Sequence, residues 1–257
     1  MSETYPRVTG ERIVTPRGGF NGSWQRHLAC YALTAPFLGS GPVLDVGCGT
    51  GHAQLHLEPR RSVGVDLDRA SLVVQARPTV QADMRRLPFR PASFGAVACV
   101  HAVEHVPDPE RVVAELAALV PPGGTVVFVT PNRLTFGLPD EVVDPYHYIE
   151  FDAEELARLC RPFFATVEPY GIFGSSRYLA FADGEKRRMT TVLRADPLKL
   201  RRLIPRRGRQ VLYDFALSHV RRNEDSPASA FTIDDFDLRS SDLASALDVV
   251  AVCTAPG

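Results

Sequence analysis

Short apolar runs bounded by turn residues alternate with stretches of helical periodicity along most of the chain. The apolar runs predict strands, because each is rich in valine and continuous enough to be buried on both faces of a sheet. Helical stretches between such strands indicate βαβ units and a parallel sheet. Seven strands are expected, at residues 42–47, 62–67, 79–83, 94–100, 124–130, 165–172 and 247–253.

The polar and helical stretches between these strands predict helices at residues 51–58, 68–77, 108–119 and 152–160. Asp108 and Asp152 open the last two at positions where a carboxylate can accept hydrogen bonds from free helix amides. The expected fold class is therefore α/β, with helices on both faces of the sheet.

The interruptions of this alternation suggest one domain with two additions. The segment from Ser175 to about Pro227 breaks the pattern with helical signals near 185–194, 197–204 and 208–222. The expected organisation is an N-terminal cover at 1–40, a core at 41–174, a basic helical insert at 175–230 and a last-strand region at 231–257.

Composition narrows the class of protein. The net charge of -1 and the pI of about 6.7 argue against a chain that binds nucleic acid over its whole surface. No apolar run is long enough for a transmembrane segment and the N-terminus lacks a signal peptide, so a cytoplasmic location is expected. The five cysteines are widely spaced without a CxxC pair, which predicts buried reduced thiols and no zinc site.

The stretch VLDVGCGTGH places three glycines where a buried strand passes into a helix. Glycine there lets the backbone approach a ligand that a Cβ would exclude. Gly49 and Gly51 are two residues apart, whereas the dinucleotide fingerprint has a wider last spacing, and no Gly-Lys-Ser/Thr follows as in a P-loop. Asp66 and Asp83 end the next two strands and could accept hydrogen bonds from a ribose and an exocyclic amine.

Five segments in register resemble the class I S-adenosylmethionine-dependent methyltransferases: VLDVGCGTGH, GVDLD, QADMRRLPF, FGAVACVHAVEHVPDP and LVPPGGTVVFVTPN, covering about residues 42–132. The resemblance implies S-adenosylmethionine as cofactor and a Rossmann-like sheet whose last strand is antiparallel. It places Gly47, Gly49 and Gly51 against the adenosine and methionine portions, Asp66 on the ribose, and Asp83 and Met84 at the adenine. The remaining cofactor-binding candidates are Asp45, Leu67 and His101.

Methyl transfer to a hydroxyl requires a group that takes its proton. Candidates are His101, Glu104 and His105 after the fourth strand, and His147 and Glu150 after the fifth. His147 is the preferred general base, oriented by Glu150 or Asp144, and His105 is the alternative. The segments DPYHYIEF and TGERIVTPRGGFNGSWQRHLACY resemble actinobacterial methyltransferases that modify sugars, glycolipid precursors and related natural products.

The insert sequence DPLKLRRLIPRRGRQVLYDFAL adds a likeness to enzymes that O-methylate mannosides for polymethylated polysaccharides. The expected function is O-methylation of a sugar or glycoside, with a small-molecule or oligosaccharide acceptor. The alternatives are methylation of a quinone-like or other small natural product, and a scaffold that binds the cofactor without chemistry. Side chains suited to a sugar pocket are Trp24, His27, Tyr31, Asn132, Arg133, Tyr146 and Tyr148.

Residues 185–209 carry ten basic residues against two acidic ones. A solvated helix face is the default interpretation, with an anionic or membrane-bound acceptor and nucleic acid as alternatives; nucleic acid is disfavoured because exposed aromatics and a known module are missing. No metal cluster is evident, although Asp140, Glu141 and Asp144 leave a divalent cation such as magnesium open. The oligomeric state is open too, a homodimer included.

Overall fold

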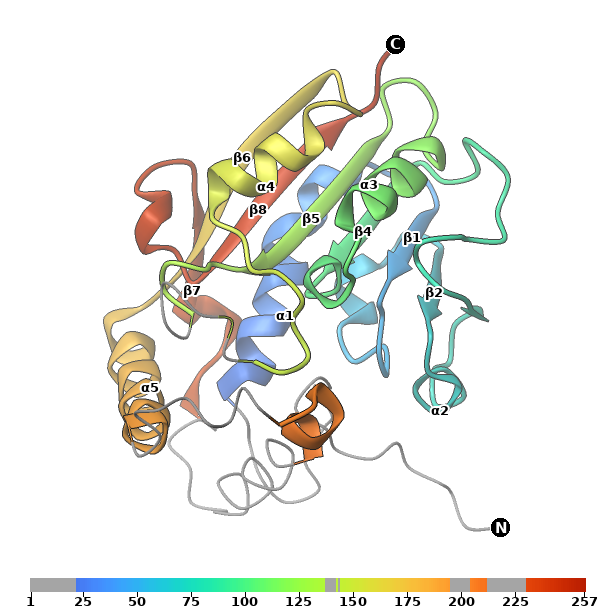
Figure 1. Cartoon of the computed structure of the whole chain (residues 1–257). Helices are drawn as coiled ribbons and strands as arrows, with labels where there is room; N and C mark the ends of the chain where they lie inside the picture. The colour runs from blue at the N-terminus through green and yellow to red at the C-terminus, as the bar shows by residue number, and fades with distance from the viewer. Residues whose placement is uncertain (1–21, 137–141, 143, 195–203, 212–229) are drawn as a thin grey trace.

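One mixed sheet organises the computed structural model, which describes residues 22–136, 142, 144–194, 204–211 and 230–257 (Figure 1). Its eight strands lie in the order β3-β2-β1-β4-β5-β8-β6-β7. Their bounds are β1 Val43–Val46, β2 Ser62–Asp66, β3 Thr79–Gln81, β4 Ala96–Val100, β5 Thr125–Pro131, β6 Thr166–Gly174, β7 Phe236–Arg239 and β8 Asp248–Thr254.

All seven expected strands are present, and β1 to β5 pair in parallel as predicted. The last strand, β8, lies antiparallel between β5 and β6. The expected total of seven strands is wrong, because β7 adds an antiparallel edge strand beside β6. With only four residues and polar Asp237 and Arg239 among them, β7 lacks the apolar run that marks the other strands.

The helices described are α1 Gly22–Thr34, α2 Arg69–Leu72, α3 Pro109–Ala118, α4 Ala153–Cys160 and α5 Ser176–Arg194. A capping box between Asp152 and Glu155 starts α4. Asp108 stands at the N-cap of α3 without a capping hydrogen bond from its side chain.

Two predicted helices are shorter than expected. The segment 51–58 forms only a 3₁₀ turn at Gln54–Leu57, and α2 ends before Val73 and Val74. These valines are exposed, so no packing offsets the low helix propensity of β-branched side chains.

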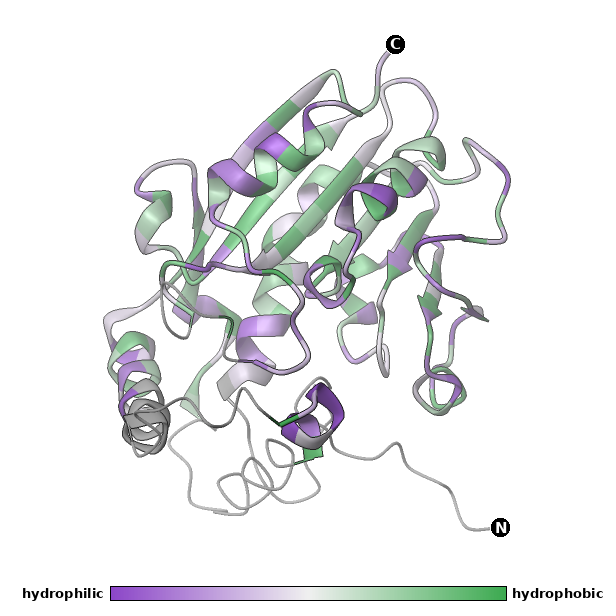
Figure 2. Cartoon of the chain, in the orientation of Figure 1, coloured by the Kyte–Doolittle hydropathy of each residue, from purple (hydrophilic) through white to green (hydrophobic). Residues whose placement is uncertain are grey.

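Alternate strand residues enter two apolar cores on opposite faces of the sheet. Val97 and Cys99 of β4 pack with Leu116 of α3 in one core, whereas Ala98 and Val100 pack with α1 in the other. In Figure 1, α3 and α4 cover one face and α1 the opposite one. The strands are the most hydrophobic part of the chain in Figure 2, as burial on both faces requires.

The predicted additions are only partly described. Helix α1 belongs to the expected cover, whereas residues 1–21 lie outside the described part. The insert begins with α5, nine residues earlier than the helix expected at 185–194, and a further helical turn covers Arg206–Val211. Most of the residues in the signals at 197–204 and 208–222 fall outside the described residues. All five cysteines are free and buried, as expected. No described helix is long and apolar enough to span a bilayer.

Candidate active site

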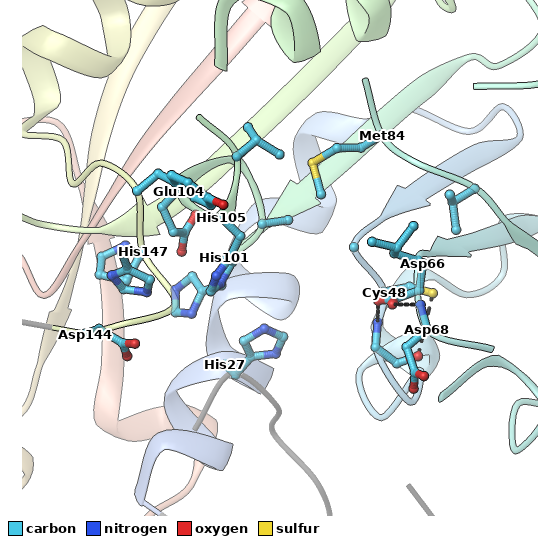
Figure 3. Close-up of a pocket in the computed structure, with 18 of the residues that line it drawn as sticks. His27, Cys48, Asp66, Asp68, Met84, His101, Glu104, His105, Asp144 and His147 are labelled. Carbon is cyan, nitrogen blue, oxygen red and sulfur yellow. Dashed lines mark hydrogen bonds between the residues drawn. The ribbon is translucent and has the colours of Figure 1, made fainter. Parts of the chain in front are cut away.

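A pocket of about 690 Å³ opens at the carboxyl ends of β1, β2 and β4, beneath α1. Parallel sheets bind ligands at this edge because the connecting loops diverge there. Figure 3 shows Cys48, Asp66 and Asp68 on one side of the pocket, and Glu104, His105, Asp144 and His147 on the other. The first group defines the glycine-loop end and the second the acceptor end.

Three glycines shape the loop after β1, and each has a positive φ. A Cβ on Gly47 would lie 2.4 Å from that of Ala102, and one on Gly51 would lie 2.4 Å from the Gln75 side chain. A Cβ on Gly49 would meet no protein atom within 4 Å. Packing therefore demands glycine at two positions, while the open side of Gly49 leaves room for a ligand against the backbone.

Asp66, at the end of β2, is held by backbone amides. Gly49 donates to Oδ2 at 2.9 Å and Asp68 donates to Oδ1 at 2.8 Å. Each carboxylate oxygen keeps a further lone pair, so the group can accept from two adjacent hydroxyls of a ribose. Asp68 instead caps α2 through the Ser71 amide at 2.9 Å.

The adenine candidates lie beside this carboxylate. Leu67 is 68% exposed and Met84 lines the same pocket, so both offer apolar surface to a planar ring. Asp83 is paired with Arg85, whose Nη2 lies 2.6 Å from Oδ2. The hydrogen bond from Arg85 lowers the pKa of Asp83, which keeps it an acceptor.

Asp45 and Gly51 do not line the pocket. Asp45 is buried and accepts from the Tyr31 hydroxyl at 2.8 Å and from Arg77 at 2.5 Å. The Asp45 side chain therefore lies beneath the loop, where its hydrogen bond to Tyr31 joins α1 to β1.

His101 reaches the pocket from the end of β4 with a positive φ of 50°. Its Nε2 lies 2.9 Å from Oδ1 of Asp248, a fully buried carboxylate at the start of β8. Arg26 of α1 donates to Asp248 through Nε at 2.7 Å and, with His101, lowers the pKa of Asp248 although burial opposes this. The sequence analysis did not identify Arg26 or Asp248 as site residues. The only sequence signal for Asp248 was that an acidic residue stands at the start of an apolar strand, β8.

His147 is the centre of the acceptor end. It is 9% exposed, and its Nδ1 lies 3.1 Å from Oε1 of buried Glu150, as the predicted orientation requires. Burial alone lowers the pKa of His147, but the hydrogen bond to Glu150 and the charges of Glu104 and Asp144 raise it above its usual range.

Two more groups complete this end. His105 packs edge-on against His147 with ring centroids 5.0 Å apart, and its Nδ1 lies 3.2 Å from the Tyr146 carbonyl oxygen. Asp144 lines the pocket and accepts from the Tyr146 amide at 2.9 Å. Asp140 and Glu141, the other expected metal candidates, lie outside the described residues.

Glu104 is fully buried in the pocket wall. Neither of its carboxylate oxygens has a hydrogen-bond partner among the residues that the structure describes. Burying a carboxylate without a hydrogen bond costs free energy, so the surroundings of Glu104 are unusual for a buried acidic residue.

A stack of rings joins the two ends along α1. The Nδ1 of His27 lies 2.8 Å from the Nε2 of His52, which packs under Trp24. Burial, helped by His101 and His56, lowers the pKa of His52 to about 4. A neutral imidazole pair can share one hydrogen bond, whereas two cations would repel.

The expected sugar-binding set is dispersed. His27 and Tyr148 line the pocket. Tyr31 binds Asp45, buried Asn132 donates to the Ala246 carbonyl at 2.8 Å, and Arg133 pairs with Asp152 at 2.9 Å. These last three side chains stabilise the fold in this structure.

The basic insert contacts the loop that carries His147. The Arg206 guanidinium lies 3.3 Å from the ring centroid of Tyr148 and donates to the carbonyls of Pro145 and Tyr146 at 2.8 and 2.7 Å. At least this arginine has a role beyond a solvated helix face.

The strand order, glycine loop and Asp66 define a Rossmann-like α/β protein with a nucleoside site and an antiparallel strand between β5 and β6. A family model described as a methyltransferase domain matches residues 44–128. A probable S-adenosylmethionine-dependent methyltransferase of Mycolicibacterium smegmatis is 30% identical over 97% of this chain and 95% of its own. The chain therefore belongs to the S-adenosylmethionine-dependent methyltransferases.

Other relatives match smaller parts. A probable S-adenosylmethionine-dependent methyltransferase of Mycobacterium tuberculosis H37Rv is 32% identical over 59% of this chain and 58% of its own. A ubiquinone biosynthesis O-methyltransferase of Chromobacterium violaceum is 40% identical over 35% of this chain and 44% of its own.

The solved structures support the fold. A methyltransferase of Thermotoga maritima, described as a possible histamine N-methyltransferase, matches with a TM-score of 0.59 and 17% identity over 90% of both chains. The [4+2]-cyclase SpnF matches with a TM-score of 0.58 and 16% identity over 98% of this chain and 88% of its own.

Proposed function

We propose that this methyltransferase acts on a hydroxyl group of a sugar or small glycoside, with mannosides as the first acceptors to test. The observation that carries the proposal is the buried His147–Glu150 pair at the end of the pocket opposite Asp66. A polar, titratable acceptor end suits a hydroxyl, which must lose its proton during transfer.

The glycine-loop end fits S-adenosylmethionine, which supplies an electrophilic methyl group on a sulfonium. Gly47 and Gly49 let the backbone approach it, and Asp66 accepts from the ribose hydroxyls. Leu67 and Met84 flank the adenine, with Asp83 as acceptor for its amine. His101, fixed by Asp248, lies between this end and the acceptor end.

The lone pair that His147 keeps on Nε2 can act on the hydroxyl in two ways. It can take the proton directly as a general base, or it can hold a divalent cation that acidifies the hydroxyl. Glu150 orients the ring in both cases, and His105 is the alternative residue. Asp144 adds a negative charge beside them.

A second candidate is O-methylation of a quinone-like small molecule. Its support is the 40% identity with a ubiquinone biosynthesis O-methyltransferase over 35% of this chain. The third alternative is a scaffold that binds the cofactor without chemistry.

The test is transfer of radiolabelled methyl from S-adenosylmethionine to mannosides, other sugars, phosphosugars and phenols, with a divalent cation and with a chelator. Label on a sugar is the expected result. Label on phenols alone supports the quinone-like acceptor. Cofactor binding without label on any acceptor supports the scaffold.

A further inference from the structure

Glu104 places a carboxylate in the pocket wall that has no hydrogen bond to a described residue, although its charge helps raise the pKa of neighbouring His147. The side chain is fully buried, and neither oxygen has a hydrogen-bond partner within the described part of the chain. Buried carboxylates are ordinarily paired, hydrogen-bonded or bound to a metal. The first two solutions do not apply to this group.

Two imidazoles next to Glu104 have their Nδ1 atoms engaged. The Nδ1 of His147 faces the Glu150 carboxylate and that of His105 faces the Tyr146 carbonyl, and both partners can only accept a hydrogen bond. Each ring must therefore donate from Nδ1, which leaves the Nε2 lone pair as the remaining donor atom. Histidines that bind metals are fixed by such outer hydrogen bonds.

We propose that Glu104, His105 and His147 bind one divalent cation at the acceptor end, an inference that rests on the O-methyltransferase function proposed above. One ligand atom from each residue lies within 4.8 Å of the other two. Ligand distances of about 2.0–2.2 Å require these three atoms to move closer together around the ion.

The donor set indicates which metal. Two imidazoles and one carboxylate suit zinc, manganese, iron or cobalt, whereas magnesium prefers oxygen ligands and keeps several waters. Three protein ligands also leave coordination positions open, which is typical of catalytic rather than structural zinc sites. Zinc and manganese are therefore expected to bind more tightly than magnesium.

A cation at the acceptor end could activate the acceptor hydroxyl. A hydroxyl oxygen bound at an open position would have a lower pKa, as water bound to zinc has. The O–H bond would then break with its proton leaving to solvent. The oxygen would form a bond to the methyl carbon while the carbon–sulfur bond of the sulfonium breaks, its electron pair staying on sulfur to give the neutral thioether, S-adenosylhomocysteine, and the cation would keep its charge and oxidation state. His147 would act as a ligand rather than as the base.

A second metal-competent cluster, Cys30, His101 and Asp248, offers an internal control. Arg26 already meets the Asp248 carboxylate with two hydrogen bonds, and His101 donates a third. This cluster therefore needs no metal to balance its charge, and Cys30→Ser should not change metal binding.

The test uses untagged full-length protein freed of metal with a chelator, titrated with Zn²⁺, Mn²⁺ and Mg²⁺ separately in a calorimeter. Wild type and Cys30→Ser should bind one equivalent of Zn²⁺ or Mn²⁺. Glu104→Gln and His105→Ala should weaken binding at least 10-fold. Without metal, Glu104→Gln should melt at a higher temperature than wild type, because the unpaired charge is gone.

Three results would overturn the site: wild type that binds no metal below millimolar concentration, Glu104→Gln that binds as wild type does, or Cys30→Ser that loses binding. His105→Ala keeps the test decisive should Glu104→Gln fail to fold. Metal binding without methyl transfer to any acceptor rejects the proposed function and leaves the site standing. Methyl transfer undiminished by chelator rejects the site and leaves His147 as base.

Discussion

Carboxylates at the two ends of the pocket meet very different surroundings. At the glycine-loop end, Asp66 accepts two backbone amides and Asp83 is paired with Arg85. At the acceptor end, Glu104 is fully buried without a hydrogen-bond partner in the described residues. The carboxylates of the first end are satisfied by protein groups, whereas Glu104 at the second end is not.

The largest expected effect belongs to the acceptor end. His147→Ala should reduce kcat by about 10²- to 10⁴-fold, the usual contribution of a side chain that accepts or donates a proton in the transition state. Binding of S-adenosylmethionine should stay within a few-fold of wild type, because Asp66 and the glycine loop are untouched. Rates and calorimetry check both halves, with His56→Ala, a histidine outside the pocket, as the matched control. Near-normal turnover of His147→Ala would indicate that His105, rather than His147, is the general base.

Asp45→Asn tests the support beneath the glycine loop. Removing the charge leaves Arg77 buried without its partner, so the free energy of unfolding should fall by about 3–5 kcal/mol. Urea denaturation measures the loss. Glu104→Gln is the comparison variant, because its carboxylate has no described partner to abandon. A loss below about 1 kcal/mol for Asp45→Asn would show that Arg77 finds another partner.

Asp66→Ala should weaken S-adenosylmethionine binding by about 10- to 100-fold, since hydrogen bonds to a charged group contribute about 1.5–3 kcal/mol. The loss of the Gly49 amide acceptor adds to this effect. Calorimetric titration measures the affinity, with Asp237→Ala on the edge strand β7, away from the pocket, as control. Unchanged affinity would remove Asp66 from the ribose site.

The last expected effect concerns the pH dependence of stability that comes from the ring stack between the two ends. The pKa of His52 is about 4 in the folded protein and about 6.5 when unfolded. The unfolded chain thus takes up a proton that the folded one refuses, and stability falls as the pH drops from 6.5 to 4, by at most about 1.4 kcal/mol per pH unit.

His52→Phe, which keeps a ring beneath Trp24, should flatten part of this pH dependence in urea melts between pH 7 and 4. His27, His101 and His56 face the same ring, and His27 has a lowered pKa too, so a residual slope is expected. An identical slope in the variant would assign the effect to other groups.

The cofactor half is predictable from sequence because its features are local. Each strand is a continuous apolar run, and the glycine loop and Asp66 directly follow such runs. The positions of Asp66 and Met84 on the pocket wall follow from parallel strands ending at one edge. The contacts of Asp45 with Tyr31 and Arg77 beneath the loop could not be predicted from its adjacency to the loop.

The contacts that fix His101 and the loop of His147 join positions that are distant in the sequence. Asp248 is 147 residues from His101 and 222 from Arg26, and neither separation carries a periodic signal. Arg206 likewise reaches Pro145 across 61 residues. His105, His147 and Glu150 could be selected from the sequence because they are polar residues that follow β4 and β5. The lack of a hydrogen-bond partner for Glu104 cannot be predicted from the sequence, because it depends on burial.

The antiparallel insertion of β8 has a consequence for biosynthesis. Strands β5 and β6 are not neighbours in the sheet; each pairs with β8, which is made 74 residues after β6 ends at Gly174. Until β8 leaves the ribosome, β5 carries an unpaired valine-rich edge and β6 has no strand to join on that side. The nascent chain must keep this edge from associating with other chains until β8 has been made and pairs with both strands.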